Sequence, residues 1–174
     1  MNRTEKQIIL ILLIFFLTSN LAISQTDDKV SNYPKIKNYF SIVHPIVTFT
    51  NSGTHLNFNG SYNVGFPVGI NFIQSDKIAF SVEFVPAIAV NDSLSMATGL
   101  LFHPGVIYRN IAGFNFLTRL AFNTNGRYGF TVVINRPIIK KEKVTYFTAI
   151  PVPFRFGNGL PASVNFGFQL GIIF

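Results

Sequence analysis

Along several segments of this chain, large apolar residues occupy every second position. The clearest case is residues 61–72, where small or polar residues separate Tyr62, Val64, Phe66, Val68, Ile70 and Phe72. Successive side chains of an extended strand point to opposite faces of a sheet, so this segment has one apolar face and one small, polar face. The pattern predicts β-strands, because a helix repeats about every 3.6 residues instead.

Turn residues divide the chain into eight runs of ten to thirteen residues. The runs cover residues 40–50, 61–72, 78–90, 98–109, 114–123, 128–139, 144–156 and 162–174. Between them lie short segments such as Asn125-Gly126, and Asn-Gly supplies the positive φ of a tight hairpin. We therefore expect an all-β, antiparallel, up-and-down sheet of about eight strands without helices.

The composition indicates the surroundings of such a sheet. Apolar residues make up 48% of the chain and charged residues 12%, and the charged fraction is about half of that usual in soluble domains. In hydrocarbon only a closed barrel leaves no backbone edge unpaired, and spanning strands need about nine to eleven residues. We expect a closed transmembrane β-barrel over residues 39–174, with its apolar faces outward and its small, polar faces inward. A secreted, soluble barrel with its phenylalanines inside is the alternative.

The first 24 residues differ from the rest of the chain. Arg3 and Lys6 precede an apolar run over residues 8–17, and Ala22-Ile23-Ser24 fits a small-residue cleavage site. Because such a run spans only about half of a bilayer core, residues 1–24 are predicted to be a cleavable signal peptide. Residues 25–38 are polar and aperiodic, and they are expected to form a periplasmic linker.

Charge and cysteine content exclude several classes of function. The chain has no Cys and a formal charge of +7, which becomes +6 when Arg3, Lys6 and Glu5 leave with the signal peptide. Disulfide frameworks and thiolate sites are therefore excluded. The lysines lie in the linker and turns, not in a stripe interleaved with aromatic residues, so we expect no nucleic-acid partner. Contacts with acidic lipid headgroups are expected instead.

Three charged residues fall on the inward faces of the predicted strands. Alternation points Glu83, Arg119 and Arg155 into the lumen. An unpaired charge in such a confined space is costly, so we expect Glu83 to pair with Arg119 or Arg155 in a polar network. The first interpretation of the network is a plug that holds the barrel, and the second is a gated path for solutes. Arg109 and Arg136 fall near strand ends, where snorkelling to headgroups is as good an account as an inward position.

The sequence offers little catalytic chemistry. His44, His55 and His103 are dispersed, and they form no recognisable arrangement with a serine and an acid. Their spacing does not fit a metal site either. We therefore expect no catalytic residue, no metal and no cofactor. Several prolines lie within predicted strands, where each removes a ladder hydrogen bond and is expected to mark a bulge or bend: Pro45, Pro67, Pro86, Pro104, Pro137, Pro151 and Pro153.

The last run carries a family resemblance. The alternating Phe166, Phe168, Leu170 and Ile172 and the final Phe174 resemble the terminal signal of bacterial outer-membrane barrels. The chain after residue 24 resembles the small, eight-stranded OmpA/OmpX-like class, and its Gln-Thr start and residues 102–108 resemble barrel proteins of Bacteroidetes-type bacteria. The resemblance implies an outer-membrane location, contact with outer-membrane lipids, and recognition of that terminal signal by the barrel-assembly machinery.

The expected role is therefore that of an envelope protein without catalytic chemistry. We expect a monomer with a structural or small-ligand-binding role, and the sequence names no ligand. A narrow, porin-like channel and a lipid-modifying outer-membrane enzyme are the alternatives. Members of the resembled class commonly carry long external loops. Here every connection is short, and residues 52–59 form the largest outward one, so a broad protein-binding surface is not expected.

Overall fold

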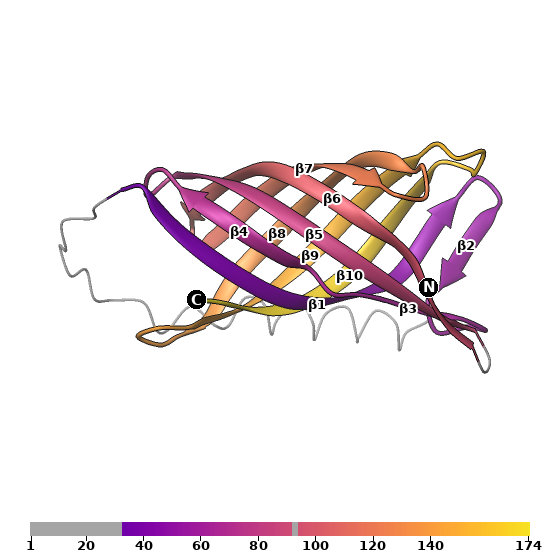
Figure 1. Ribbon diagram of the computed structural model, residues 1–174, viewed down its shortest axis with the longest axis horizontal. Coiled ribbons are helices and arrows are strands. Elements are labelled where there is room, and N and C mark those ends of the chain that lie inside the picture. The colour runs from indigo at the N-terminus through magenta and orange to yellow at the C-terminus, as the bar shows by residue number, and fades with distance from the viewer. Residues whose placement is uncertain (1–32, 92–93) are drawn as a thin grey trace, which may run out of the picture. The chain divides into compact units, whose positions relative to one another are not determined.

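The structure, a computed structural model, describes residues 33–91 and 94–174, and within them it contains one antiparallel sheet of ten strands (Figure 1). The strands are β1 (Lys35–Thr50), β2 (Gly53–Leu56), β3 (Tyr62–Gly65), β4 (Val68–Ile73), β5 (Ile78–Asn91), β6 (Leu94–Ile111), β7 (Phe114–Asn123), β8 (Tyr128–Lys140), β9 (Thr145–Phe156) and β10 (Ser163–Ile173). The predicted signal peptide, residues 1–24, lies outside the described residues. None of the described residues belongs to a helix long and apolar enough to cross a membrane.

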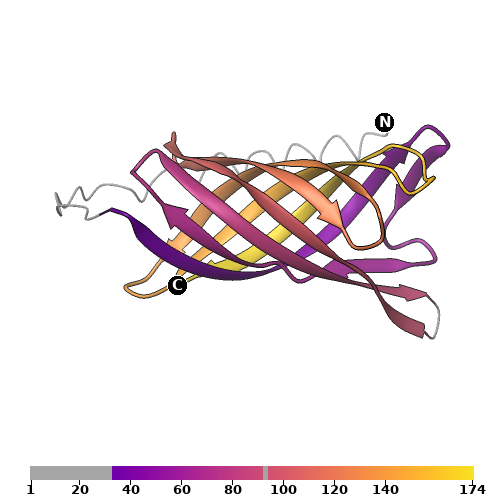
Figure 2. The ribbon, with the colours of Figure 1, turned by 45° about the horizontal axis from the view of Figure 1, so that its top comes forward.

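The sheet closes on itself through β1. One edge of β1 pairs with β10, from Tyr39↔Ile173 to Thr50↔Ser163. Its other edge pairs with β4, β3 and β2, and the remaining strands pair consecutively from β5 to β10. A sheet whose first and last long strands pair has the connectivity of a β-barrel, and only the short β2, which pairs with β1 alone, keeps a free edge among the described strands. The strands wind obliquely around a common axis (Figures 1 and 2).

The strand count differs from the expected eight because one run is divided and one loop contains a strand. Phe66 and Pro67 separate β3 from β4, although the Phe66 N–H still donates to the Pro86 carbonyl at 2.9 Å. The four residues of β2 lie in the connection predicted to be an outward loop. The start of the sheet also differs. β1 begins at Lys35 and not at residue 39, and residues 35–38 of the expected linker pair with β4.

The ladder is irregular beside most of the prolines within strands. Register shifts lie at Pro45 in the β1–β10 pairing and at Pro137 in the β8–β9 pairing. Pro104 stays in register with β5, but the β6–β7 pairing passes from residue 102 directly to residue 105. The β9–β10 pairing likewise passes from residue 149 to residue 154, beside Pro151 and Pro153. Because proline has no N–H to donate, these residues leave local breaks in the sheet.

The two faces of the sheet differ in side-chain chemistry. Large apolar side chains lie on the outer face of β1 and of every strand from β4 to β10; Leu120, Phe122 and Leu170, for example, are 56%, 51% and 49% exposed. The inner face holds nearly all of the buried polar residues, including Ser81, Glu83 and Gln169. It is less uniformly small and polar than expected, because an apolar cluster also lies inside: Tyr39, Ala79, Ile107, Leu117, Val133, Phe147 and Ala149.

The barrel has two ends, which we call basal and distal. The basal end holds the first residue of β1, the last residue of β10, and the β4–β5, β6–β7 and β8–β9 turns. The distal end holds the β1–β2, β7–β8 and β9–β10 connections. The β7–β8 turn confirms the Asn-Gly prediction, since Gly126 has φ 84° and the Asn123 N–H donates to the Arg127 carbonyl at 2.8 Å.

Candidate functional site

A buried carboxylate lies at the centre of the barrel interior. Glu83, on β5, is 2% exposed, and three other strands supply its partners. The Tyr39 hydroxyl, from β1, donates to Oε2 at 2.7 Å, and His103 Nδ1, from β6, lies 2.8 Å from Oε1. Arg119 Nη1, from β7, lies 3.5 Å from Oε2. Four strands are thereby joined across the lumen by one side chain.

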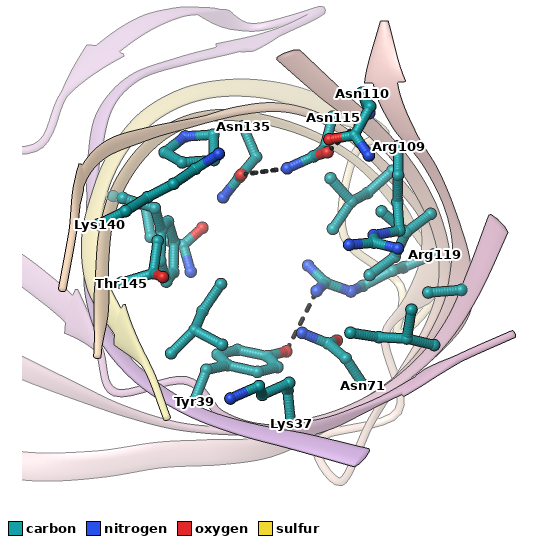
Figure 3. Close-up of a pocket in the computed structure, with 18 residues that line it drawn as sticks. Lys37, Tyr39, Asn71, Arg109, Asn110, Asn115, Arg119, Asn135, Lys140 and Thr145 are labelled. Atoms are coloured by element: carbon teal, nitrogen blue, oxygen red, sulfur yellow. Dashed lines mark hydrogen bonds between the residues drawn. The ribbon is translucent and has the colours of Figure 1, made fainter. Parts of the chain in front are cut away.

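Arg119 is the second hub of this cluster. It is 4% exposed, and its Nη2 donates to the Tyr39 hydroxyl and to Ser81 Oγ, each at 3.1 Å. Figure 3 shows Arg119 and Tyr39 extending toward each other inside the barrel, with the hydrogen bond between them. The guanidinium carbon also lies 5.9 Å from the centre of the Tyr39 ring. Arg119 therefore balances the charge of Glu83 directly and orients Tyr39 toward it.

Arg155 joins the cluster indirectly. Its Nη2 donates to Thr131 Oγ1 at 3.0 Å, and Thr131 Oγ1 lies 2.9 Å from His103 Nε2. The Thr131 oxygen accepts a hydrogen bond from Arg155, so the Thr131 hydroxyl can donate its own proton to His103 Nε2. His103 Nδ1–H then donates to Glu83, and this assignment fits a neutral imidazole. The two predicted arginines thus differ: Arg119 contacts Glu83, whereas Arg155 reaches it through Thr131 and His103.

We call Tyr39, Ser81, Glu83, His103, Arg119, Thr131 and Arg155 the interior network. The sequence placed three of its members, Glu83, Arg119 and Arg155, on inward faces. His103 was expected to be only structural, and Tyr39, Ser81 and Thr131 were given no role. A short polar residue such as Thr131 carries no signal of its own in a single sequence, because alternation says which face it occupies and not which residue it meets.

His103 lies opposite Glu83 because β6 contains one extra residue. The β5–β6 register shifts between Ala87 and Ile88. This shift leaves Thr98 unpaired, and its hydroxyl donates to the Ala87 carbonyl at 3.3 Å. Without the bulge Glu83 would lie opposite residue 102, whose side chain is on the outer face. A one-residue bulge decides which side chains meet across two strands, and this one is not visible in the sequence.

Two inward-facing glycines make room for the network. A Cβ on Gly69 would lie 2.5 Å from the hydroxyl oxygen of Tyr39. A Cβ on Gly105 would lie 2.5 Å from Arg119 Cγ and 2.3 Å from the Thr118 carbonyl oxygen. Both distances are far below carbon contact distance, so only glycine fits at these positions unless the network moves. These small residues of the alternating pattern therefore leave room on the inner face for large interior side chains such as Tyr39 and Arg119.

The geometry around His103 has one feature in common with catalytic triads. A hydroxyl, an imidazole and a carboxylate follow one another at 2.9 Å and 2.8 Å in Thr131, His103 and Glu83, which is the spacing of a nucleophile, a base and an orienting acid. Thr131, however, is 1% exposed. Its hydroxyl lies inside the barrel, within hydrogen-bond distance of Arg155 and His103.

The other histidines lie elsewhere. His44 Nδ1 is 2.6 Å from the Tyr62 hydroxyl, and His55 is exposed in β2. Within residues 33–91 and 94–174, no group of three or more His, Asp or Glu residues is placed to hold a metal ion.

The residues of the predicted assembly signal lie on β10 and just after it. Phe166, Phe168, Leu170 and Phe174 are exposed, and Ile172 is partly buried. Phe166 packs edge-to-face against Phe49 of β1, with 6.1 Å between the ring centres. The aromatic face of the last strand is therefore accessible on the outer surface, and its recognition by an assembly machinery stays a prediction.

No known protein family and no curated protein matches the chain. Among solved structures, a de novo designed transmembrane β-barrel is similar at 13% identity and a TM-score of 0.44, over 82% of this chain and 97% of that one. The designed barrel TMB2.3 is 11% identical, with a TM-score of 0.40 over 83% and 96%. The outer membrane protein OprG of Pseudomonas aeruginosa is 11% identical, with a TM-score of 0.36 over 79% and 92%. Identities this low assign no residue of the interior network to a known site.

Proposed function

We propose that the chain is an integral outer-membrane β-barrel protein with a structural, non-enzymatic role in the cell envelope. The observation that carries the proposal is that the outer face of the sheet is apolar and the inner face is largely polar. Phenylalanine, leucine and isoleucine side chains cover the outer surface, while ion-paired and hydrogen-bonded groups fill the inside. Soluble monomers rarely expose continuous apolar surface on this scale, and a lipid bilayer accepts it.

Backbone pairing supports the same location. A spanning sheet must pair its backbone groups internally, and the β1–β10 pairing joins the first and last long strands of the sheet. The strands from β5 to β10 have 10 to 18 residues, long enough for the tilted crossing of about nine to eleven residues. Proposed export to the outer membrane also relies on the signal peptide expected in residues 1–24.

The interior network supports a structural role over a channel. Tyr39, Glu83, His103, Arg119 and Thr131 are each at most 4% exposed. Side chains from five strands therefore fill the cross-section at this level, as small barrels usually do. We propose that this network is a plug that holds the strands together, and that the barrel conducts no ions. A planar bilayer containing the purified protein should show no conductance above background, and steady single-channel steps would instead identify a channel.

The membrane location has a direct test with a matched control. Leu120, 56% exposed on β7, should face lipid, whereas Leu160, 52% exposed, lies in the β9–β10 connection outside the strands. Leu120→Arg should destabilise the folded barrel in lipid vesicles by about 2–4 kcal/mol, and Leu160→Arg by less than about 1 kcal/mol. Unheated and heated gels report the folded fraction. Equal effects of the two variants, or wild-type protein that stays monomeric in water without detergent, would remove the proposed location.

A further inference from the structure

A pocket opens into the basal end of the barrel. Its volume is about 200 Å³, and its walls come from the ends of strands on all sides (Figure 3). Lys140 and Asn110 lie exposed at the basal end, and Tyr39 and Arg119 of the interior network also line the pocket. The pocket therefore extends from the exposed basal end to the side chains of the interior network.

The charge of the basal pocket has one sign. Lys37, Arg109, Arg119 and Lys140 line it, and none of its lining residues is Asp or Glu. Glu83, which balances Arg119, is not among the lining residues. Among the described residues, the structure records no ion pair for the two lysines or for Arg109. Such a concave, cationic site with partly apolar walls concentrates small anions, because the low-dielectric walls strengthen the field.

Two residues that line the pocket each have a fully buried polar atom without a hydrogen-bond partner among the described residues, and both atoms lie just behind the pocket wall. One is Arg119 Nε, a donor, and the other is Asn71 Oδ1, an acceptor. Arg119 is 4% exposed and Asn71 9%. Arg119 uses its Nη atoms on Glu83, Tyr39 and Ser81, so Nε is the atom it leaves for a ligand. Buried polar groups are nearly always paired in folded proteins, and after small shifts of the two side chains a ligand that both accepts and donates would satisfy both.

We propose that the basal pocket binds a small tetrahedral oxyanion that also carries a hydrogen-bond donor, namely hydrogen phosphate or a phosphate monoester. Its negative oxygens accept from Arg119 Nε–H and face Lys37, Arg109 and Lys140. The P–O–H of hydrogen phosphate, or a hydroxyl on the alcohol part of a monoester, donates to Asn71 Oδ1. Asn115, Asn135 and Gln169 supply further polar atoms in the wall. The inference deepens the proposed function. It rests on the proposed outer-membrane location only in that this location decides which compartment supplies the anion.

Calorimetric titration of the purified full chain in detergent micelles tests the proposal. The probes are inorganic phosphate and sulfate in mildly alkaline buffer of low ionic strength. The two ions have the same shape and charge, but only hydrogen phosphate can donate to Asn71. We expect saturable phosphate binding that is about tenfold tighter than sulfate binding. No saturable phosphate binding, or equal affinity for both ions, would overturn the proposal. Glycerol 3-phosphate is the third probe. If it binds more tightly than inorganic phosphate, the ligand is a lipid headgroup; if it binds no more tightly, the ligand is free phosphate.

A pair of charge-matched variants locates the site. Lys37→Gln with Lys140→Gln removes two pocket lysines, while Lys141→Gln with Lys143→Gln removes two exposed lysines of the neighbouring β8–β9 turn that do not line the pocket. The first variant should weaken phosphate binding at least tenfold, and the second less than twofold. Equal losses would show general attraction to the basal end and overturn the pocket. Asn71→Leu should abolish the preference for phosphate over sulfate.

The outcomes separate this inference from the proposed function. Protein that fractionates with membranes and migrates faster when unheated, but binds no phosphate, removes the pocket and leaves the membrane barrel intact. Protein that binds phosphate but is soluble without detergent removes the membrane location and leaves the pocket intact.

Discussion

Replacing Glu83 with Gln removes the central negative charge of the interior network with almost no change in side-chain size. Arg119, itself 4% exposed and 3.5 Å from the carboxylate, then keeps its charge without a counter-ion. At an effective dielectric constant of about 20, a pair at this distance contributes about 5 kcal/mol. Removal of one partner of a buried pair typically costs about 3–5 kcal/mol. We take the lower end, about 3 kcal/mol, because Arg119 keeps its bonds to Tyr39 and Ser81.

Equilibrium unfolding in urea measures this cost. Protein refolded into lipid vesicles is incubated at increasing urea concentrations, and unheated gel mobility and tyrosine fluorescence report the folded fraction. With the usual dependence of about 1–3 kcal/mol per molar of urea, a loss of 3 kcal/mol lowers the midpoint by about 1–3 M. A loss of this size is a large share of the stability of most proteins, which is about 5–15 kcal/mol.

The control is Glu142→Gln, which neutralises an exposed carboxylate in the β8–β9 turn and should change stability by less than about 0.5 kcal/mol. In a double-mutant cycle, Glu83→Gln and Arg119→Gln together should cost less than the sum of the two single changes by about 0.5–3 kcal/mol. If Glu83→Gln unfolds at the same midpoint as Glu142→Gln, the network does not hold the barrel and the reasoning fails.

Three further predictions concern single positions. Gly69→Ala should destabilise the barrel by about 1–3 kcal/mol in the same assay, because the new Cβ displaces Tyr39. Thr131→Val should cost about 1–3 kcal/mol, because it leaves His103 Nε2 buried without its hydroxyl partner; an unchanged midpoint would remove that link. Phe174→Ser should lower the amount of folded protein in the outer membrane of cells by several-fold, while refolding of the purified protein into vesicles changes little; equal loss in both would assign Phe174 to stability and not to assembly.

Much of the architecture could be predicted from the period of the sequence. Alternation over residues 61–72 and 162–174 fixed which side chains lie on the outer face, and Asn125-Gly126 fixed a hairpin. One of the two additional strands came from the break at Pro67, and the other, β2, lies in a connection without an alternating pattern. The side chains on either side of a proline in an alternating run still point to the same faces of the sheet. The sequence pattern therefore continues across the break between β3 and β4. The early start of β1 was missed because Lys35 and Lys37 look like linker residues, although Lys37 points into the basal pocket (Figure 3).

The candidate site was less predictable than the fold. Alternation identifies a residue as inward, and the costs of buried charge then indicate that Glu83 needs a cation. Which partner it meets depends on register, and the bulge at Thr98 moves the part of β6 that follows it by one position relative to β5. Arg109 is a second residue whose position could not be predicted from alternation alone. The sequence left open whether it points inward or reaches the headgroups, and the structure places it in the wall of the basal pocket, where it donates to the Ser75 carbonyl at 2.6 Å.

Because β1 pairs with β10, the sheet could begin and end at one of its turns instead of at the β1–β10 seam. Asn38 and Phe174 exchange backbone hydrogen bonds at 3.0 Å and 2.9 Å, so the two ends of the sheet already lie side by side at the basal end. A few added residues could connect them, and the chain could be opened within the exposed residues 141–143. Such a circular permutant should rebuild the same sheet, because every strand would keep the neighbours it has now.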